Sequence, residues 1–317
     1  MREKRVLVCG ASGFIGRNIF ERLLSDERLS VFGIYLKHCF SDSERLLRVD
    51  LTDYQETLRI TKEFDCIVHA AAITAGFLAV RQNPAAYLAP NDLMNINLIS
   101  AAHVNNVRQF IFLSSTAIYP PYTGRPVTED DFDVKLICPQ YETVAWTKVF
   151  GEKRCLHYAG LGNTKYTVLR PANIYGPYDK FSERGHAFPS FIAKVAEASD
   201  GDAINVTGDG SAERDLLSVK DLVNAIKCVI KYQENPFERL NVGSGSTVSI
   251  KNLVAKIIEI SGKKLSVKLN PGQLSIDTKV QLDSSLIHKQ YGWQPTVSLE
   301  EGICGTMDWY NKHKKHI

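Results

Sequence analysis

The chain has 317 residues, of which 44% are hydrophobic and 23% charged, a balance typical of a folded globular protein. The net charge is only +3 and Lys and Arg are scattered, which argues against a nucleic-acid partner, and no apolar run is long enough for a membrane span or a signal peptide. The seven cysteines are odd in number and contain no C-x-x-C pair, so we expect neither a disulfide framework nor a metal site, and we expect a cytoplasmic location.

Strand-like and helix-like patterns alternate through the first half of the chain, which is typical of β-α-β units around a parallel sheet. Strands are predicted at 5–9, 30–36, 46–49, 66–70, 110–113 and 166–169. Helices are predicted at 14–24, 85–106 and 140–160. The expected fold class is therefore α/β, with a Rossmann-type doubly wound parallel sheet.

Turn signals become frequent after residue 170, and further helices are predicted at 187–199, 219–233, 250–261 and 299–312. We interpret this half as a smaller C-terminal α/β lobe that receives the substrate. The predicted domains are a dinucleotide-binding domain at 1–170 and a substrate lobe at 171–317. A segment around 213–240 is expected to return to the first domain.

A glycine-rich turn lies between the first predicted strand and the first predicted helix. Glycines spaced in this way allow a tight bend and bring backbone amides close to a pyrophosphate at the start of the helix. The alternative is a purely structural strand-to-helix turn. The residues expected to hold a dinucleotide here are Gly10, Ser12, Gly13, Phe14, Ile15 and Gly16.

The end of the second strand indicates which dinucleotide is bound. An acidic residue there suits the ribose 2′-hydroxyl of NAD, and a basic residue suits the 2′-phosphate of NADP. The chain has Lys37 and no acid at this point, which favours NADP and leaves NAD possible. After the third strand, Asp50 and Leu51 either contact the adenine or cap the following helix.

Several motifs together give the chain a wider resemblance. Besides the glycine turn they are His69-Ala-Ala-Ala72, Ser114-Ser115-Thr116 and Arg170-Pro-Ala-Asn-Ile-Tyr-Gly-Pro177. On these the chain resembles the extended short-chain dehydrogenase/reductases. Stretches at 91–105, 112–120 and 185–189 make it most similar to the GDP-L-fucose synthase branch of that family, whose members act with NADP on a GDP-linked 4-keto-6-deoxy sugar.

The resemblance implies a role for individual residues. Ser115, with Thr116 beside it, would hold the oxygen on C4 of the sugar, and Lys148 would bind the nicotinamide ribose. Ser115 as a turn cap and Lys148 as a solvated helix lysine are the alternatives. Other cofactor contacts would be Ala70, Ala71, Ala72, Pro171 and Asn173. The substrate contacts would be Asn173, His186, Arg214 and Lys279.

One departure from the family concerns the proton donor. The family has a tyrosine four residues before the lysine, and this chain has Val144 there. Tyr141 could substitute, because it precedes Lys148 by two helical turns. The proton could instead pass through a relay of Thr116, Tyr119, His186 or water, or the protein could bind its ligands with little or no turnover.

A second departure is Ala117, where the fucose synthases have the cysteine used for carbon epimerisation. The histidine that accompanies it corresponds to His186 and is retained. Without the thiol, epimerisation at C3 and C5 is not expected, whereas redox chemistry at C4 remains possible.

Together with the glycine turn and Lys37, the resemblance implies an NADP(H)-dependent oxidoreductase that acts at C4 of a nucleotide-linked sugar. The resemblance also implies that the nucleotide is GDP. The alternatives left open are an NAD-dependent epimerase or dehydrogenase that retains its cofactor, and a catalytically silent binding subunit. The resemblance also implies a homodimer formed through the helices at 85–106 and 140–160. From charge and composition we expect no membrane or nucleic-acid partner.

Overall fold

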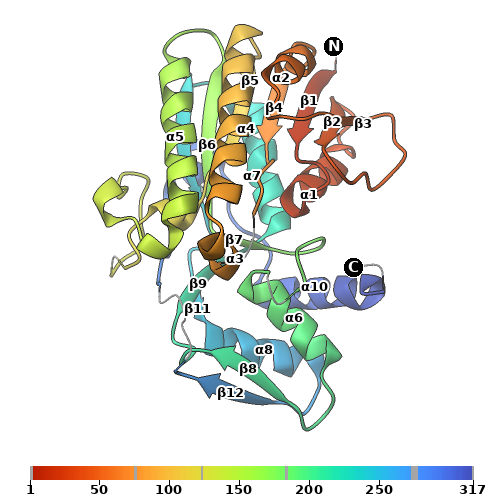
Figure 1. Cartoon of the computed structure of the whole chain (residues 1–317), viewed down its shortest axis with the longest axis vertical. Coiled ribbons are helices and arrows are strands. Elements are labelled where there is room, and N and C mark those ends of the chain that lie inside the picture. The colour runs from red at the N-terminus through yellow and green to blue at the C-terminus, as the bar shows by residue number, and fades with distance from the viewer. Residues whose placement is uncertain (1–2, 75–76, 123, 183–184, 273–277, 316–317) are drawn as a thin grey trace.

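The computed structural model describes residues 3–74, 77–122, 124–182, 185–272 and 278–315 (Figure 1). Its centre is a seven-stranded sheet with the order β10-β6-β5-β4-β1-β2-β3, in which every neighbouring pair is parallel. The strands are β1 (Lys4–Cys9), β2 (Leu29–Tyr35), β3 (Leu46–Arg48), β4 (Cys66–His69), β5 (Gln109–Leu113), β6 (Lys165–Pro171) and β10 (Phe237–Val242). The predicted doubly wound α/β fold is confirmed.

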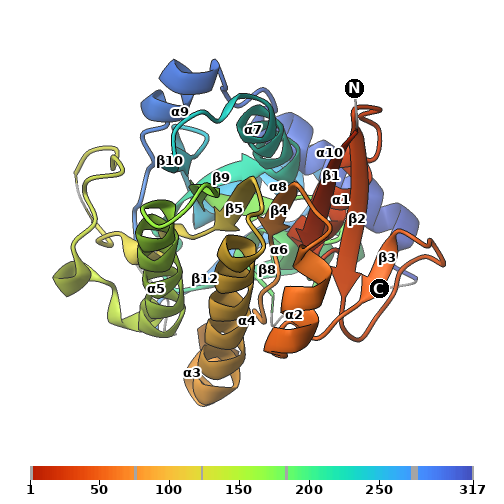
Figure 2. The same ribbon diagram turned by 90° about the horizontal axis from the view of Figure 1, so that it is seen from above.

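Helices cover both faces of this sheet (Figure 2). On one face α4 (Ala85–Val104) packs between α2 (Tyr54–Thr61) and α5 (Glu142–Ala159), and on the other α1 (Phe14–Leu23) packs against α7 (Val219–Tyr232). Val6 and Val8 of β1 enter one core and Leu7 and Cys9 enter the other, because successive side chains of a strand point to opposite faces and both faces of this sheet are covered. Within the described residues, no helix is both long and apolar enough to cross a bilayer.

The later part of the chain builds a second group of elements beyond the carboxyl ends of the strands, in the lower part of Figure 1. Its strands form the sheets β11-β9-β7 and β12-β8, from β7 (Asn173–Tyr175), β8 (Ala203–Thr207), β9 (Glu213–Ser218), β11 (Thr247–Ser249) and β12 (Ser266–Asn270). Its helices α6 (Ala187–Glu197), α8 (Ile250–Ser261) and α10 (Leu299–His313) share a third apolar core. Strand β10 also belongs to the later part of the sequence, but in space it pairs with β6 at the edge of the large sheet.

Some short elements have no counterpart among the predictions. They include α3 (Phe77–Gln82) and α9 (Ser285–Tyr291), with the 3₁₀ helices η1 (Thr116–Ile118), η2 (Val134–Leu136) and η3 (Pro139–Tyr141). Helix α2 is the helix expected after Asp50 and Leu51, for which the sequence predicts no bounds. Helix α2 is capped by Asp53, and its buried positions are Thr57 and Thr61. Ile60 also packs against the core, so the buried face of this helix mixes threonine with apolar side chains and gives only a weak apolar pattern in the sequence.

A buried ion pair joins the helix layer to the sheet. Arg170 at the end of β6 donates to Glu152 on α5 through Nη2 (2.6 Å) and Nε (3.0 Å), and both residues are buried. Glu152 also accepts the hydroxyl proton of Ser114, and Arg170 Nη1 donates to the Tyr119 hydroxyl at 2.8 Å. Tyr119 in turn donates to Asn241 Oδ1 at 2.6 Å. The network therefore ties together α5, β10 and the ends of β5 and β6.

Removing one partner of this pair is expected to destabilise the fold strongly. Glu152→Ala leaves the Arg170 guanidinium buried and uncompensated, which should lower the free energy of unfolding by about 3–5 kcal/mol in urea denaturation. The matched control is Asp130→Ala, which removes the Asp130–Arg239 pair, since the Asp130 side chain is 94% exposed. That loss should be about 1 kcal/mol or less. Equal losses in the two variants would contradict a structural role for the buried pair.

Candidate active site

Many of the predicted site residues follow the carboxyl ends of strands of the large sheet. These ends lie at one edge because the strands are parallel. Topological order reverses between β1 and β4, where the glycine turn and the residues after β4 meet. The residues brought to this edge are Gly10 and Ser12 after β1, Lys37 after β2, Asp50 and Leu51 after β3, Ala70, Ala71 and Ala72 after β4, Ser115 and Thr116 after β5, and Pro171 and Asn173 at β6 and β7.

The glycine turn is shaped by close backbone contacts. Gly10 has φ +84°, and a Cβ on it would stand 2.6 Å from the Cα of Ala71. A Cβ on Gly16 would stand 2.0 Å from the carbonyl oxygen of Gly10. No side chain can occupy either position without moving backbone, so the turn stays narrow and open to a ligand.

Helix α1 begins at this turn without a side-chain cap. Its N-cap is Gly13, no capping hydrogen bond from a described side chain reaches it, and its first turn contains no acidic residue. The first amides of a helix, here those of Phe14, Ile15 and Gly16, have no acceptor within the helix and favour negative charge. These residues fit the pyrophosphate of a dinucleotide.

The residues beside the turn are arranged as follows. Lys37 is exposed two residues after β2 ends. Asp50 is half-buried, and its Oδ1 accepts the amide (2.9 Å) and hydroxyl (2.7 Å) protons of Thr52. Asp53, not Asp50, caps α2, so the reading of Asp50 as a helix cap is wrong.

Lys148 is not the solvated helix lysine that was one alternative. Its Nζ donates to the carbonyl oxygen of Leu113 at 2.8 Å and lies 5.2 Å from the centre of the Phe112 ring. Burial lowers the pKa of Lys148 to about 8. The ammonium is therefore held at the end of β5, beside Ser115. Val144, one helical turn earlier on α5, is half-buried.

The hydroxyl groups near Lys148 differ in their availability. Ser115 is the N-cap of η1, and its Oγ accepts the amide proton of Ala117 at 3.1 Å. Thr116 begins η1 and is half-buried. Tyr119 is fully buried in the Arg170 network, and burial raises its pKa to about 12. Tyr141 is half-buried and is the residue at which η3 ends and α5 is capped.

The predicted phosphate-binding residues lie on and beside β9. Arg214 Nη1 donates to Thr278 (3.0 Å to the carbonyl oxygen, 2.9 Å to Oγ1). Arg214 also lines a recess of about 370 Å³, with residues of 244–248 and 295–299. Lys279 is exposed, and its Nζ pairs with Glu213 Oε1 at 2.8 Å. Asn173 Nδ2 donates to the carbonyl oxygen of Asp215 at 3.1 Å.

His186 lies at the N-cap of α6, after the segment that follows β7. Lys180 in this segment donates to the carbonyl oxygen of Thr74, in the loop after β4, at 2.6 Å. The His186 side chain is exposed by surface area, but reduced hydration and then the charge of Lys180 lower its pKa.

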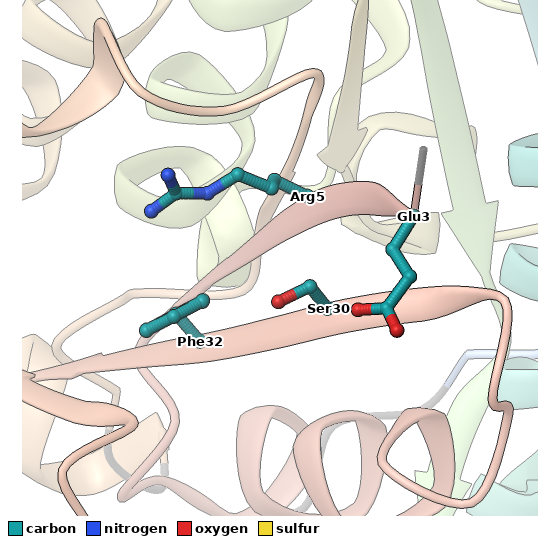
Figure 3. A pocket seen from close by; sticks show the side chains of 4 residues that line it. All are labelled: Glu3, Arg5, Ser30 and Phe32. Atoms are coloured by element: carbon teal, nitrogen blue, oxygen red, sulfur yellow. The ribbon is translucent and has the colours of Figure 1, made fainter. Parts of the chain in front are cut away.

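Two features of the structure fall outside the predicted residues. His69 and Asn95 are buried and hydrogen-bonded to each other beneath the edge, and only the motif containing His69 hinted at this. A recess of about 430 Å³ lies at the opposite edge of the sheet, lined by Glu3, Arg5, Ser30 and Phe32 (Figure 3). It contains no predicted site residue and plays no part in the candidate site.

Comparison with known proteins gives a consistent picture. The family model described as "NAD dependent epimerase/dehydratase family" matches residues 6–243. The probable GDP-L-fucose synthase 1 of Oryza sativa subsp. japonica is 31% identical over 96% of this chain and 92% of its own length. The GDP-L-fucose synthase of Escherichia coli (strain K12) is 28% identical over 98% of this chain and 97% of its own.

A solved structure supports the same resemblance at the level of the fold. The UDP-N-acetylglucosamine 4-epimerase from Methanobrevibacter ruminantium M1, in complex with UDP-N-acetylmuramic acid, has a TM-score of 0.85 at 25% identity, and the match covers 99% of this chain and 100% of that one. Together with the sequence matches, this confirms the family resemblance drawn from the motifs.

Proposed function

The chain belongs to the NAD dependent epimerase/dehydratase family, and on that premise we propose that it is an NADP(H)-dependent oxidoreductase acting at C4 of a nucleotide-linked sugar. GDP is the nucleotide we expect, because the curated relatives at 28–31% identity include GDP-L-fucose synthases. In this proposal residues 1–170, with the returning segment around 213–240, bind the dinucleotide. The rest of 171–317 receives the sugar nucleotide, in a cytoplasmic protein whose seven cysteines are free.

The observation that carries the proposal is the juxtaposition at the carboxyl edge of β1, β4 and β5. The uncapped start of α1 offers backbone amides to a pyrophosphate, and Lys148 is fixed to the carbonyl oxygen of Leu113, next to Ser115. A dinucleotide-dependent reaction at a sugar carbonyl requires such groups: amides that donate hydrogen bonds to the phosphates, a side chain that binds the ribose, and a hydroxyl that donates to the carbonyl oxygen.

The roles of the chain's own residues follow from their hydrogen bonds. Ser115 Oγ already accepts the Ala117 amide, so its hydroxyl proton is left to donate to the sugar C4 oxygen, with Thr116 beside it. Lys148 holds the ribose and stabilises the negative charge that develops on the C4 oxygen. When bound, the nicotinamide supplies or accepts the hydride.

The proton that tyrosine donates in the family needs another source here. Tyr119 is an unsuitable source, because its hydroxyl is buried and engaged by Arg170 and Asn241. We propose that Thr116, His186 or a water molecule carries the proton, with Tyr141 the next candidate. Ala117 supplies no thiol, so the proposed chemistry is redox at C4 without epimerisation at C3 and C5.

The substrate diphosphate is assigned to Arg214, whose planar guanidinium lines the 370 Å³ recess and suits bidentate phosphate binding. Asn173 and His186 are assigned to the sugar side. Lys279 is the weakest of these assignments, because its charge is already paired with Glu213.

A second candidate function has one specific observation in its favour. Val144 replaces the residue that donates the proton, while the cofactor turn and Lys148 are retained. A protein of this kind could bind NADP and a sugar nucleotide without turnover and serve as a binding subunit. The experiment that follows separates the two candidates.

Turnover is tested by following NADPH oxidation at 340 nm against a panel of GDP- and UDP-linked 4-keto-6-deoxy sugars. We expect oxidation with a GDP-linked member of the panel, and Ser115→Ala should reduce kcat/KM by about 10²–10³-fold because it removes the donor to the C4 oxygen. Absence of turnover with every sugar, combined with activity gained by Val144→Tyr, would establish the silent binding protein instead.

Cofactor preference is tested with a charge reversal after β2. Lys37→Glu should weaken NADP binding by about 10-fold or more and leave NAD binding within about 2-fold, because only NADP has the 2′-phosphate that the lysine would meet. Isothermal titration calorimetry measures both affinities. Lys62→Glu, at the exposed end of α2, makes the same charge change away from the turn and should alter neither affinity. Equal losses of NADP and NAD in Lys37→Glu would remove the argument for NADP.

We further propose a homodimer through α4 and α5, which lie side by side on one flank of the molecule (Figure 2). Large apolar side chains on these helices are exposed, among them Leu93 (46%), Phe150 (46%) and Leu156 (45%). Sedimentation velocity at micromolar concentration should give a dimer, and Phe150→Glu should shift it toward monomer. A monomeric wild-type protein would contradict the proposal.

A further inference from the structure

A chain of buried hydrogen bonds connects β4 to α5 through α4. His69, the last residue of β4, has its Nε2 2.8 Å from Oδ1 of Asn95 on α4. Asn95 Nδ2 lies 3.2 Å from the carbonyl oxygen of Thr147 on α5. All three residues are buried, with exposed fractions of 2% for His69, 5% for Asn95 and 4% for Thr147. This series of hydrogen bonds ends at Thr147, one residue before Lys148.

The carbonyl oxygen of Thr147, the final acceptor in this series, determines the direction of each hydrogen bond. A carbonyl oxygen only accepts, so the amide group of Asn95 must present its NH₂ to Thr147 and its oxygen to His69. Nε2 of His69 therefore carries the proton and donates. Nδ1 is then an unprotonated acceptor, and it is buried with no hydrogen-bond partner among the described residues.

His69 and Lys148 share one aromatic neighbour. The His69 ring centroid lies 5.6 Å from that of Phe112, and Lys148 Nζ lies 5.2 Å from the centre of the same Phe112 ring. Burial, and then the charge of Lys148, lower the pKa of His69 to about 3, so the imidazole is neutral throughout the physiological range. The neutral His69 therefore places no second positive charge beside the Lys148 ammonium.

We propose that His69 and Asn95 are positioning residues for Lys148: their hydrogen bonds fix α5 to the end of β4 at Thr147 and so hold the lysine ammonium against the carbonyl oxygen of Leu113. The inference rests on the proposed function, in which Lys148 binds the nicotinamide ribose. It extends that function to two residues that touch neither cofactor nor substrate.

The physical reason is the length of the lysine side chain. Lys148 has a flexible side chain of four methylene groups, and its ammonium donates to the carbonyl oxygen of Leu113 at 2.8 Å. A small rotation or shift of the first turns of α5 would break that contact and let water reach the ammonium. The Asn95 bond to Thr147 opposes this movement at the adjacent residue.

The test measures Lys148 directly, by competitive acylation with acetic anhydride across pH and quantification of the Lys148 peptide by mass spectrometry. Wild type should show half-maximal reactivity near the pKa of about 8. Asn95→Leu keeps the side-chain shape and removes both hydrogen bonds. It should raise that midpoint by about one pH unit or more, toward the value of a hydrated lysine. NADP affinity, measured by calorimetry, should fall by about 10-fold in the same variant.

Asn105→Leu is the matched control. It makes the same substitution at the end of α4, roughly 15 Å along the helix, where Asn105 Nδ2 donates to the carbonyl oxygen of Leu58 and to Thr61 Oγ1. Its Lys148 midpoint should equal that of wild type. His69→Gln places an amide donor near the position of Nε2 and should keep the wild-type midpoint, whereas His69→Leu should raise it. This pair carries the test if Asn95→Leu does not fold.

The outcomes separate the inference from the proposed function. An unchanged midpoint in Asn95→Leu or in His69→Leu, or an equal change in Asn105→Leu, overturns the positioning role. A raised midpoint confined to Asn95→Leu and His69→Leu supports it. If NADP affinity then stays at the wild-type value, the positioning role stands and the contact between Lys148 and the cofactor is wrong.

Discussion

Arg170 and Glu152 form an ion pair inside the protein, and the buried hydrogen bonds of Ser114 and Tyr119 beneath the candidate site are joined to it. Removing two charges from water is costly, and the cost is offset here because Arg170 donates to Glu152, to Tyr119 and to the carbonyl oxygen of Glu129. Glu152 also accepts the hydroxyl of Ser114. The residue after Ser114 and the residue one turn before Glu152 are Ser115 and Lys148. The ion pair therefore helps to hold Ser115 through its neighbour Ser114, and Lys148 through the next turn of α5.

Helix α5, which carries Glu152, shows why the fold of the family can persist without the family's tyrosine. Val144, Lys148 and Glu152 follow one another at four-residue intervals on α5 and so share a face. The interactions that hold this face are made by Lys148, with Leu113, and by Glu152, with Arg170. Because position 144 lies a turn beyond them, a valine there leaves the support intact and changes only the chemistry offered to a ligand.

The large sheet was predictable, whereas the smaller lobe was predicted only in its helices. Strands such as β1 and β5 are buried on both faces and appear in the sequence as continuous apolar runs, and the structure places them within a residue of the prediction. In β8 and β12 the apolar residues alternate with polar ones, as at Ile204 and Val206, and this signal was available in the sequence. In β7 and β11, of three residues each, the period cannot be recognised.

By itself the sequence determined the glycine turn, the absence of a tyrosine at 144 and of a thiol at 117, and the spacing that places Lys148 and Glu152 on one face. These are local properties, since periodicity and spacing within one element encode which face a residue occupies. The tertiary structure alone decided that Lys148 donates to the carbonyl oxygen of Leu113 and that Lys279 forms an ion pair with Glu213. It alone also decided that His69 is hydrogen-bonded to Asn95. It also decided that Tyr119 meets Asn241, which is 122 residues away in the chain. Such partners are brought together by the order and register of strands distant in sequence, and no pattern within a single element specifies them.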